Sequence, residues 1–179
     1  MKSFKHLIIF CLLFLSPTLL LYPESVPLKT TASVFFSPKG GCTTAIVNTI
    51  NSARQEILVQ AYSFTSQPIA DALVNAYKRN IKVEIILDKS QLTAKSSMLN
   101  YVVQSGIPTY IDSKHAIAHN KIIIIDKKTV ITGSFNFTKS AEERNAENLI
   151  IIPSAELAGV YIKNFLAHKQ HSVKYKISH

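Results

Sequence analysis

Short apolar runs of strand length alternate along this chain with segments whose apolar residues recur at helical spacing. The runs are rich in Val, Ile and Phe, and they predict strands at 32–36, 57–62, 83–87, 109–111 and 149–152. Apolar stripes predict helices from 42 to near 55, from 67 onward, at 94–104, near 138–143 and around 157–165. Strands that alternate with helices indicate an α/β fold in one layered domain.

The stretch that follows the fourth strand predicts a β-hairpin, which makes the sheet mixed rather than wholly parallel. With the turn centred on 127–128, Lys121 would lie opposite Ser134, and His119 would lie opposite Asn136. A histidine, a lysine and two neutral hydrogen-bonding side chains would then meet on one surface. Such a group can bind and attack a phosphate ester.

The net charge narrows the possible partners. Across 179 residues, 20 Lys and Arg stand against 11 Asp and Glu, a formal charge of +9. Without residues 1–24, which contain two lysines and one glutamate, 18 basic and 10 acidic residues leave a charge of +8. A basic domain favours a polyanionic partner, either nucleic acid or an anionic lipid surface.

The first 24 residues are expected to lie outside the folded domain. Two lysines precede an apolar stretch at 7–22, which is typical of an export signal and shorter than most membrane-spanning helices. No small-x-small cleavage pattern follows, so residues 1–24 are predicted to be either an export signal or an N-terminal membrane anchor. Residues 25–179 would then form a single domain in the periplasm or cell envelope, anchored to the membrane or secreted.

Cysteine and histidine spacing gives little indication of a metal site. Cys11 lies in the leader, which leaves Cys42 alone in the domain and predicts a small buried residue at a helix start. His115 and His119 would share one face of a helix, but this segment is predicted to enter a strand, and no third ligand stands out. We therefore expect no metal and no cofactor.

The C-terminal region is basic, and from Lys169 it is predicted to be loose. Its positive or titratable side chains are expected either to be solvated or to contact phosphate; they are Lys163, His168, Lys169, His171, Lys174 and Lys176. Tyr175 is the one aromatic residue after Phe165, which gives little support for base stacking there.

A set of polar residues in the hairpin resembles a known catalytic motif. His119, Lys121 and Asp126 are spaced as H-x-K-x4-D, and G-S-F-N follows at 133–136, where the glycine would allow close backbone approach. The two motifs resemble the signature of the phospholipase D superfamily, in particular its short, single-motif nuclease branch. Further similar blocks are F-S-P-K-G-G-C at 36–42, Q-A-Y-S-F-T at 60–65, I-I-L-D-K-S at 85–90 and N-A-E-N at 145–148. The resemblance covers roughly residues 32–168 and implies the phospholipase D/nuclease fold, an α/β domain with a mixed β-sheet flanked by helices.

The resemblance also implies a role for each polar residue. His119 would be the catalytic nucleophile on phosphorus, and Lys121 would hold the non-bridging oxygens. Ser134 and Asn136 resemble phosphate ligands that support Lys121. Glu147 is the candidate catalytic partner for the Nδ1 proton of His119.

Asp126 is counted in the family's motif, so it is also a candidate catalytic residue. Its position argues against direct chemistry, because it has the opposite strand parity to His119 and Lys121 and lies at the predicted turn. The spacing alone predicts a residue that orients the hairpin loop or forms an ion pair.

These observations predict an exported, metal-independent phosphodiesterase. It would be a nuclease that cuts DNA or RNA with little sequence preference through a phosphohistidine intermediate. A phospholipase D that acts on phospholipid head groups is the alternative, and a non-catalytic polyanion-binding protein is a third hypothesis from another class. Larger relatives carry two copies of the motif and this chain carries one, so we also expect a homodimer with a shared active site.

Overall fold

The computed structural model describes residues 25–177, and the predicted leader lies outside this range. Within it the chain forms eight strands and six helical segments. In order they are β1 (Ser33–Ser37), α1 (Cys42–Asn51), β2 (Glu56–Ala61), α2 (Gln67–Lys78), β3 (Lys82–Asp88), the 3-10 helix η1 (Lys89–Leu92), α3 (Leu99–Gln104), β4 (Thr109–Asp112), β5 (Lys121–Ile125), β6 (Thr129–Gly133), α4 (Lys139–Glu143), β7 (Glu147–Pro153), α5 (Ala155–His171) and β8 (Val173–Lys174). None of these helices is both long enough and apolar enough to cross a bilayer.

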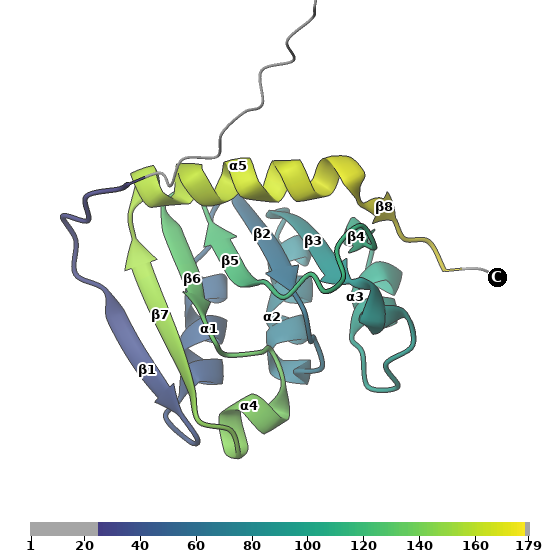
Figure 1. Ribbon diagram of the computed structural model, residues 1–179, viewed down its shortest axis with the longest axis horizontal. Coiled ribbons are helices and arrows are strands. Elements are labelled where there is room, and N and C mark those ends of the chain that lie inside the picture. Colours follow the sequence, from purple (N-terminus) through teal and green to yellow (C-terminus); the bar gives the residue numbers. More distant parts are fainter. Residues whose placement is uncertain (1–24, 178–179) are drawn as a thin grey trace, which may run out of the picture.

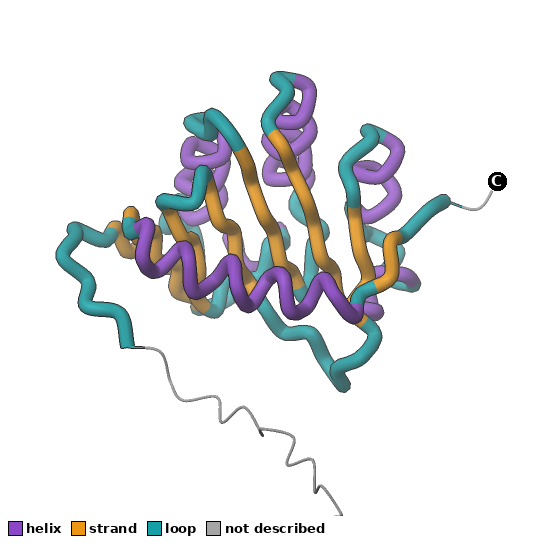
Figure 2. Tube along the Cα trace, turned by 90° about the horizontal axis from the view of Figure 1, so that it is seen from above, coloured by secondary structure: helices purple, strands orange, loops and turns teal. Residues whose placement is uncertain are grey.

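All the strands belong to one mixed sheet, in the order β1-β7-β6-β5-β2-β3-β4-β8. β2, β3 and β4 run parallel to one another, whereas the other neighbouring pairs are antiparallel. Figures 1 and 2 show α1, α2 and α3 on one face of the sheet and α5 across the other. The predicted α/β fold with a mixed sheet flanked by helices is confirmed.

Two apolar cores fill the spaces between the sheet and its helices. The larger includes Ile85 and Ile123 together with the buried faces of α1 and α2. The smaller includes Ile124 and Phe165 and lies under α5. Alternate residues of the central strands thus enter opposite cores, which explains why every residue of β5 is buried, including Lys121.

The β5–β6 hairpin differs from the predicted hairpin by one residue. Ile125 pairs with Thr129, so a three-residue loop separates the strands. The first two loop residues, Asp126 and Lys127, have left-handed backbone conformations with φ angles of 52° and 56°. The loop therefore replaces the two-residue turn that the sequence predicts. Continued along the strands, this register brings Lys121 level with Gly133 instead of Ser134. His119, Ser134 and Asn136 lie outside both strands, so the two predicted cross-strand pairs are wrong.

Two other segments differ from their predicted structures. Only the second half of the helix predicted at 94–104 is helical, as α3. The region predicted to be loose from Lys169 is instead the end of α5 followed by β8, which pairs with β4. The Tyr175 hydroxyl also donates to Asn100 Oδ1 at 3.1 Å. The C-terminal region is therefore part of the fold, because the strand edge of β4 offers it backbone partners.

α1 begins at Cys42, which is fully buried as predicted. The N-terminus of this helix is capped by α4, since the Glu142 carboxylate accepts hydrogen bonds from the amides of Gly41 and Thr43 at 3.0 and 2.7 Å. A carboxylate at the positive end of a helix dipole is stabilising. The contact holds the connection between β6 and β7 against α1.

Candidate active site

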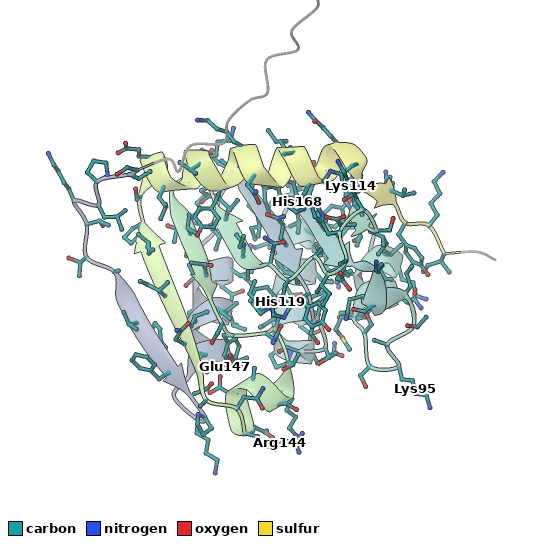
Figure 3. The ribbon with its side chains drawn as sticks, viewed as in Figure 1. Lys95, Lys114, His119, Arg144, Glu147 and His168 are labelled. Carbon is teal, nitrogen blue, oxygen red and sulfur yellow. The ribbon has the colours of Figure 1, made fainter. Side chains whose placement is uncertain are left out.

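His119 lies in the loop two residues before the start of β5, and its side chain is exposed. Figure 3 shows it below α5. Hydrogen bonds hold the residues on either side of it. The Ala118 amide donates to the buried Asp88 carboxylate at 2.7 Å, and the Tyr62 amide donates to the Asn120 carbonyl at 2.9 Å. The backbone around His119 is therefore fixed while the ring remains accessible, as a nucleophile requires.

Lys121 is buried two residues further along the chain. Its ammonium group donates to the His119 carbonyl at 2.8 Å and lies 5.3 Å from the centre of the Tyr62 ring. The same ring is 4.6 Å from the His119 ring, centre to centre. Burial lowers the pKa of Lys121, while the negative charge of Glu147 acts in the opposite direction. An imidazole, a cation and an aromatic ring thus form one unit at the start of β5.

The G-S-F-N segment closes the end of β6 beside this unit. Gly133 has a φ angle of 143°, and a Cβ atom there would lie 2.3 Å from the Asn148 carbonyl oxygen, so only glycine fits. The backbone amide of Ser134 donates to Asn148 Oδ1 at 2.8 Å, and the backbone amide of Asn148 donates to Ser134 Oγ at 3.0 Å. This reciprocal pair fixes the position of Ser134.

The other two predicted site residues are less closely tied to His119. Asn136 is half-buried, and its Oδ1 atom has no hydrogen-bond partner among the described residues. Glu147, at the start of β7, accepts a hydrogen bond from Asn145 Nδ2 at 3.2 Å. Its carboxylate influences Lys121 through charge. The predicted hydrogen bond from His119 to Glu147 is not formed within residues 25–177 of this single chain.

A cleft of about 690 Å³ opens beside His119 and Lys121. Its polar wall comes from the start of β5 and the end of β6. The facing wall comes from α5 and the N-terminal segment and is largely apolar, with Val26, Leu28, Leu157 and Val160. The imidazole and the ammonium group therefore border both solvent and an apolar surface.

Comparison with known proteins agrees with this geometry. The family model described as the PLD-like domain of cardiolipin synthase matches residues 46–169. A phospholipase D of Rickettsia felis is 47% identical over 154 residues, which cover 86% of this chain and 77% of that protein. This chain belongs to the phospholipase D superfamily. It is a hydrolase of that superfamily, and a more distant relative is the mitochondrial cardiolipin hydrolase of Mus musculus, which is 27% identical over 120 residues.

Two solved structures share the phospholipase D fold seen here. Nuc from Salmonella typhimurium, a phospholipase D family member, is 38% identical with a TM-score of 0.79, and the match covers 83% of this chain and 100% of Nuc. NucT from Helicobacter pylori is 27% identical with a TM-score of 0.76, over 82% of this chain and 100% of NucT. The predicted family and fold are both confirmed.

In this phospholipase D superfamily member, the motif aspartate lies at the far end of β5 from His119. Its carboxylate oxygens accept hydrogen bonds from the amides of Arg54, Gln55 and Glu56 at 2.7–3.0 Å. Burial alone would raise the pKa of Asp126, but these hydrogen bonds outweigh it and lower that pKa. Asp126 ties the hairpin turn to the connection between α1 and β2. These hydrogen bonds support a structural role for Asp126, and its assignment to the catalytic group stays a prediction.

We expect Asp126→Asn to lower the free energy of unfolding by about 1–3 kcal/mol while leaving the turnover of folded enzyme unchanged. Asparagine tolerates the left-handed turn, but it brings an amide group toward backbone donors. Because the pKa of Asp126 is lowered on folding, its stabilisation is present above the unfolded pKa and is lost as the pH falls. Wild type and variant should therefore converge in stability below about pH 4. Urea unfolding at neutral and acid pH measures this, and a large loss of turnover in folded variant would restore a catalytic role.

Two residues of the site were missed in the sequence. Tyr62 contacts the His119 and Lys121 side chains, and Asn148 holds Ser134 in place. Strand alternation gives no reason to choose either residue. The signal that could have indicated them is their position in two of the blocks that resemble the superfamily, Q-A-Y-S-F-T and N-A-E-N.

Three side chains of the basic C-terminal region differ from both of their expected roles, whereas Lys163, Lys174 and Lys176 are exposed, in keeping with one of the two alternatives. Lys169 forms an ion pair with Glu84, and its ammonium group lies 5.0 Å from the centre of the Tyr110 ring. His168 and His171 turn toward a buried carboxylate at the end of β4. These three side chains therefore pack against the domain rather than extend into solvent or toward a phosphate backbone.

Proposed function

We propose that this hydrolase is an exported, metal-independent phosphodiesterase that cleaves nucleic acid with little sequence preference through a phosphohistidine intermediate. The observation that carries the proposal is the exposed imidazole of His119 beside the buried ammonium group of Lys121. An imidazole at the surface can reach a bond within a long polymer. The charge of +8 on residues 25–179 favours a polyanion, and Figure 3 shows Lys95 and Arg144 at the edge of the molecule, both below His119 in this view. The apolar stretch at 7–22 supports export.

The proposed reaction has two steps. In the first, a nitrogen of His119 attacks phosphorus, and the bond from phosphorus to the leaving oxygen breaks. Lys121 offsets the negative charge that develops on the non-bridging oxygens, and a general acid protonates the leaving oxygen. In the second step, water attacks the phosphohistidine, gives its proton to the same group acting as a base, and releases His119 with the second product.

We infer that the general acid is a second copy of His119, supplied by a homodimer. His115, the alternative within the chain, lies against Asp112 at 3.0 Å. Ile117 and Phe36, which lie near His119 and Glu147 respectively, are 57% and 66% exposed. Large exposed apolar side chains around a polar site favour contact with a second protein surface. A two-fold axis through this surface would bring the two imidazoles together.

A phospholipase D activity is the second candidate, and the shape of the cleft favours it. The apolar wall formed by Leu28, Leu157 and Val160 faces the side of the cleft that holds His119. Such a wall could accept the apolar part of a phospholipid while the same histidine attacks the head-group phosphodiester. The relatives named phospholipase D point in the same direction.

A comparison of substrates tests these candidates. The protein would be given DNA, RNA and anionic phospholipid vesicles in the presence of a chelator, with His119→Ala as the control for each substrate. We expect His119-dependent cleavage of nucleic acid that is faster than the release of any lipid head group. Preferential head-group release would support the phospholipase, and no turnover of any substrate would favour the non-catalytic polyanion-binding protein.

Binding to DNA should weaken steeply as salt is added. For about five phosphate contacts, the affinity of His119→Ala for DNA should fall roughly 10²–10³-fold between about 50 and 200 mM salt. Fluorescence anisotropy with a labelled oligonucleotide measures the slope, which Lys95→Ala and Arg144→Ala should each reduce by about one if they contact phosphate. A flat response, or selective binding to vesicles, would count against a nuclease.

A further inference from the structure

A second cluster of polar side chains lies near the C-terminal end of α5, beyond the part of this helix that lines the cleft. It combines Asp112 and His115, from the end of β4 and the turn after it, with His168 and His171 from the last turn of α5. One potential ligand atom from each residue lies within 4.8 Å of all the others. Figure 3 shows His168 at the right-hand end of α5, apart from His119.

The three imidazoles converge on one carboxylate oxygen. His168 Nδ1, His115 Nδ1 and His171 Nε2 lie 2.7, 3.0 and 3.2 Å from Asp112 Oδ2. The Asp112 side chain is completely buried, whereas the His115 side chain is 43% exposed. The cluster therefore has a buried anionic floor and an opening to solvent.

Hydrogen bonds alone account poorly for this convergence. An ionised carboxylate oxygen offers about two lone-pair sites, whereas three imidazole nitrogens approach Asp112 Oδ2. If all three rings were protonated, three positive charges would lie with ring centres 4.8–5.3 Å apart, and their repulsion would oppose the arrangement. A divalent cation would instead accept a lone pair from each neutral ring and from the carboxylate.

The spacing and the distances both fit a tetrahedral centre. D-x2-H at 112–115 and H-x2-H at 168–171 each place two side chains on one side of a turn. With metal–ligand distances of about 2.0–2.1 Å, the ligand atoms of a tetrahedral site lie about 3.4 Å apart. The nitrogen–oxygen distances of 2.7–3.2 Å would need to lengthen by about 0.2–0.7 Å to reach this spacing.

We propose that Asp112, His115, His168 and His171 bind one divalent cation of the zinc class. Four protein ligands close the coordination sphere, so the site is structural rather than catalytic. The cation fastens the end of α5 to segment 113–118, which leads directly to His119. This proposal is independent of which phosphodiester the active site hydrolyses.

Calorimetric titration of Zn²⁺ into the chelator-treated, full-length protein tests the site. We expect one Zn²⁺ per chain and a midpoint of thermal unfolding about 5–10 °C higher when the site is saturated. Co²⁺ in place of Zn²⁺ should give the visible absorption of a tetrahedral nitrogen–oxygen site. This readout does not depend on activity.

His115→Gln and His171→Gln are suitable variants, because both side chains are partly exposed and the chain should fold without them. Each should weaken Zn²⁺ binding roughly 100-fold or more. His119→Gln is the matched control, and it should bind Zn²⁺ like wild type while losing turnover. If wild type does not bind Zn²⁺, or if Zn²⁺ stabilises all three variants equally, the cluster is only a hydrogen-bonded group around Asp112 and the proposal is overturned.

Discussion

Replacing His119 by alanine should lower the rate of phosphodiester hydrolysis by about 10⁴-fold or more and leave the thermal unfolding midpoint nearly unchanged. The backbone on either side of His119 is held by Asp88 and by the amide of Tyr62, not by the imidazole ring. The substitution therefore removes the proposed nucleophile and little of the local structure. Rates on a labelled oligonucleotide, together with thermal unfolding, separate loss of chemistry from loss of fold.

The same variant tests the covalent intermediate and the absence of catalytic metal. Rapid quenching of wild type with a labelled substrate should leave label on the peptide that contains His119, whereas His119→Ala should retain none. At a temperature well below unfolding, EDTA should reduce the rate far less than this substitution does. A protein that remains folded in EDTA and yet loses as much activity as His119→Ala would contradict the phosphohistidine mechanism.

The fold was largely predictable because its central strands are buried on both faces. Continuous apolar runs such as 83–87 and 122–125 have few alternatives to a buried strand once helices alternate with them. The ends of the sheet were less predictable. β8 has only two residues, and its pairing with β4 depends on where α5 delivers the chain rather than on its own sequence.

The register of the hairpin shows a different limit. Asp126 and Lys127 adopt left-handed conformations, although the sequence has neither a glycine nor an Asn-Gly pair at these positions to indicate them. The turn therefore gained one residue relative to expectation, which moved Lys121 level with Gly133. The structural role that strand parity predicts for Asp126 is consistent with its hydrogen bonds to the connection between α1 and β2.

The histidine cluster could not be assembled from sequence spacing. H-x3-H at 115–119 has the spacing of a metal-binding pair on a helix, but the two rings turn to different partners, Asp112 and Tyr62. The other two histidines of the proposed site, His168 and His171, lie on α5, beyond the hairpin in the sequence. Only the tertiary contact between α5 and the end of β4 brings these two short motifs together.

Specific activity should fall when the protein is diluted below the dissociation constant of the proposed dimer, because each active site would need two copies of His119. Ile117→Asp should shift this dependence to higher protein concentration, since it places a charge on an exposed apolar position two residues from His119. Leu92→Asp is the matched control, because Leu92 is 50% exposed but lies beside β8. Sedimentation and activity measured over the same dilution series should give parallel transitions.

Mixing wild type with His119→Ala gives the sharper test of a shared site. If both imidazoles act in one reaction, a mixed dimer is inactive, and an equimolar mixture that exchanges freely should retain about a quarter of the wild-type activity, as random pairing requires. Independent sites would retain about half, because every wild-type chain would still work.

The shared site also requires one neutral and one protonated imidazole, so the rate should pass through a maximum as the pH is varied. A fully active monomer would exclude the shared site, and because His115 is directed at Asp112, Tyr62 would then be the first residue to test as the general acid.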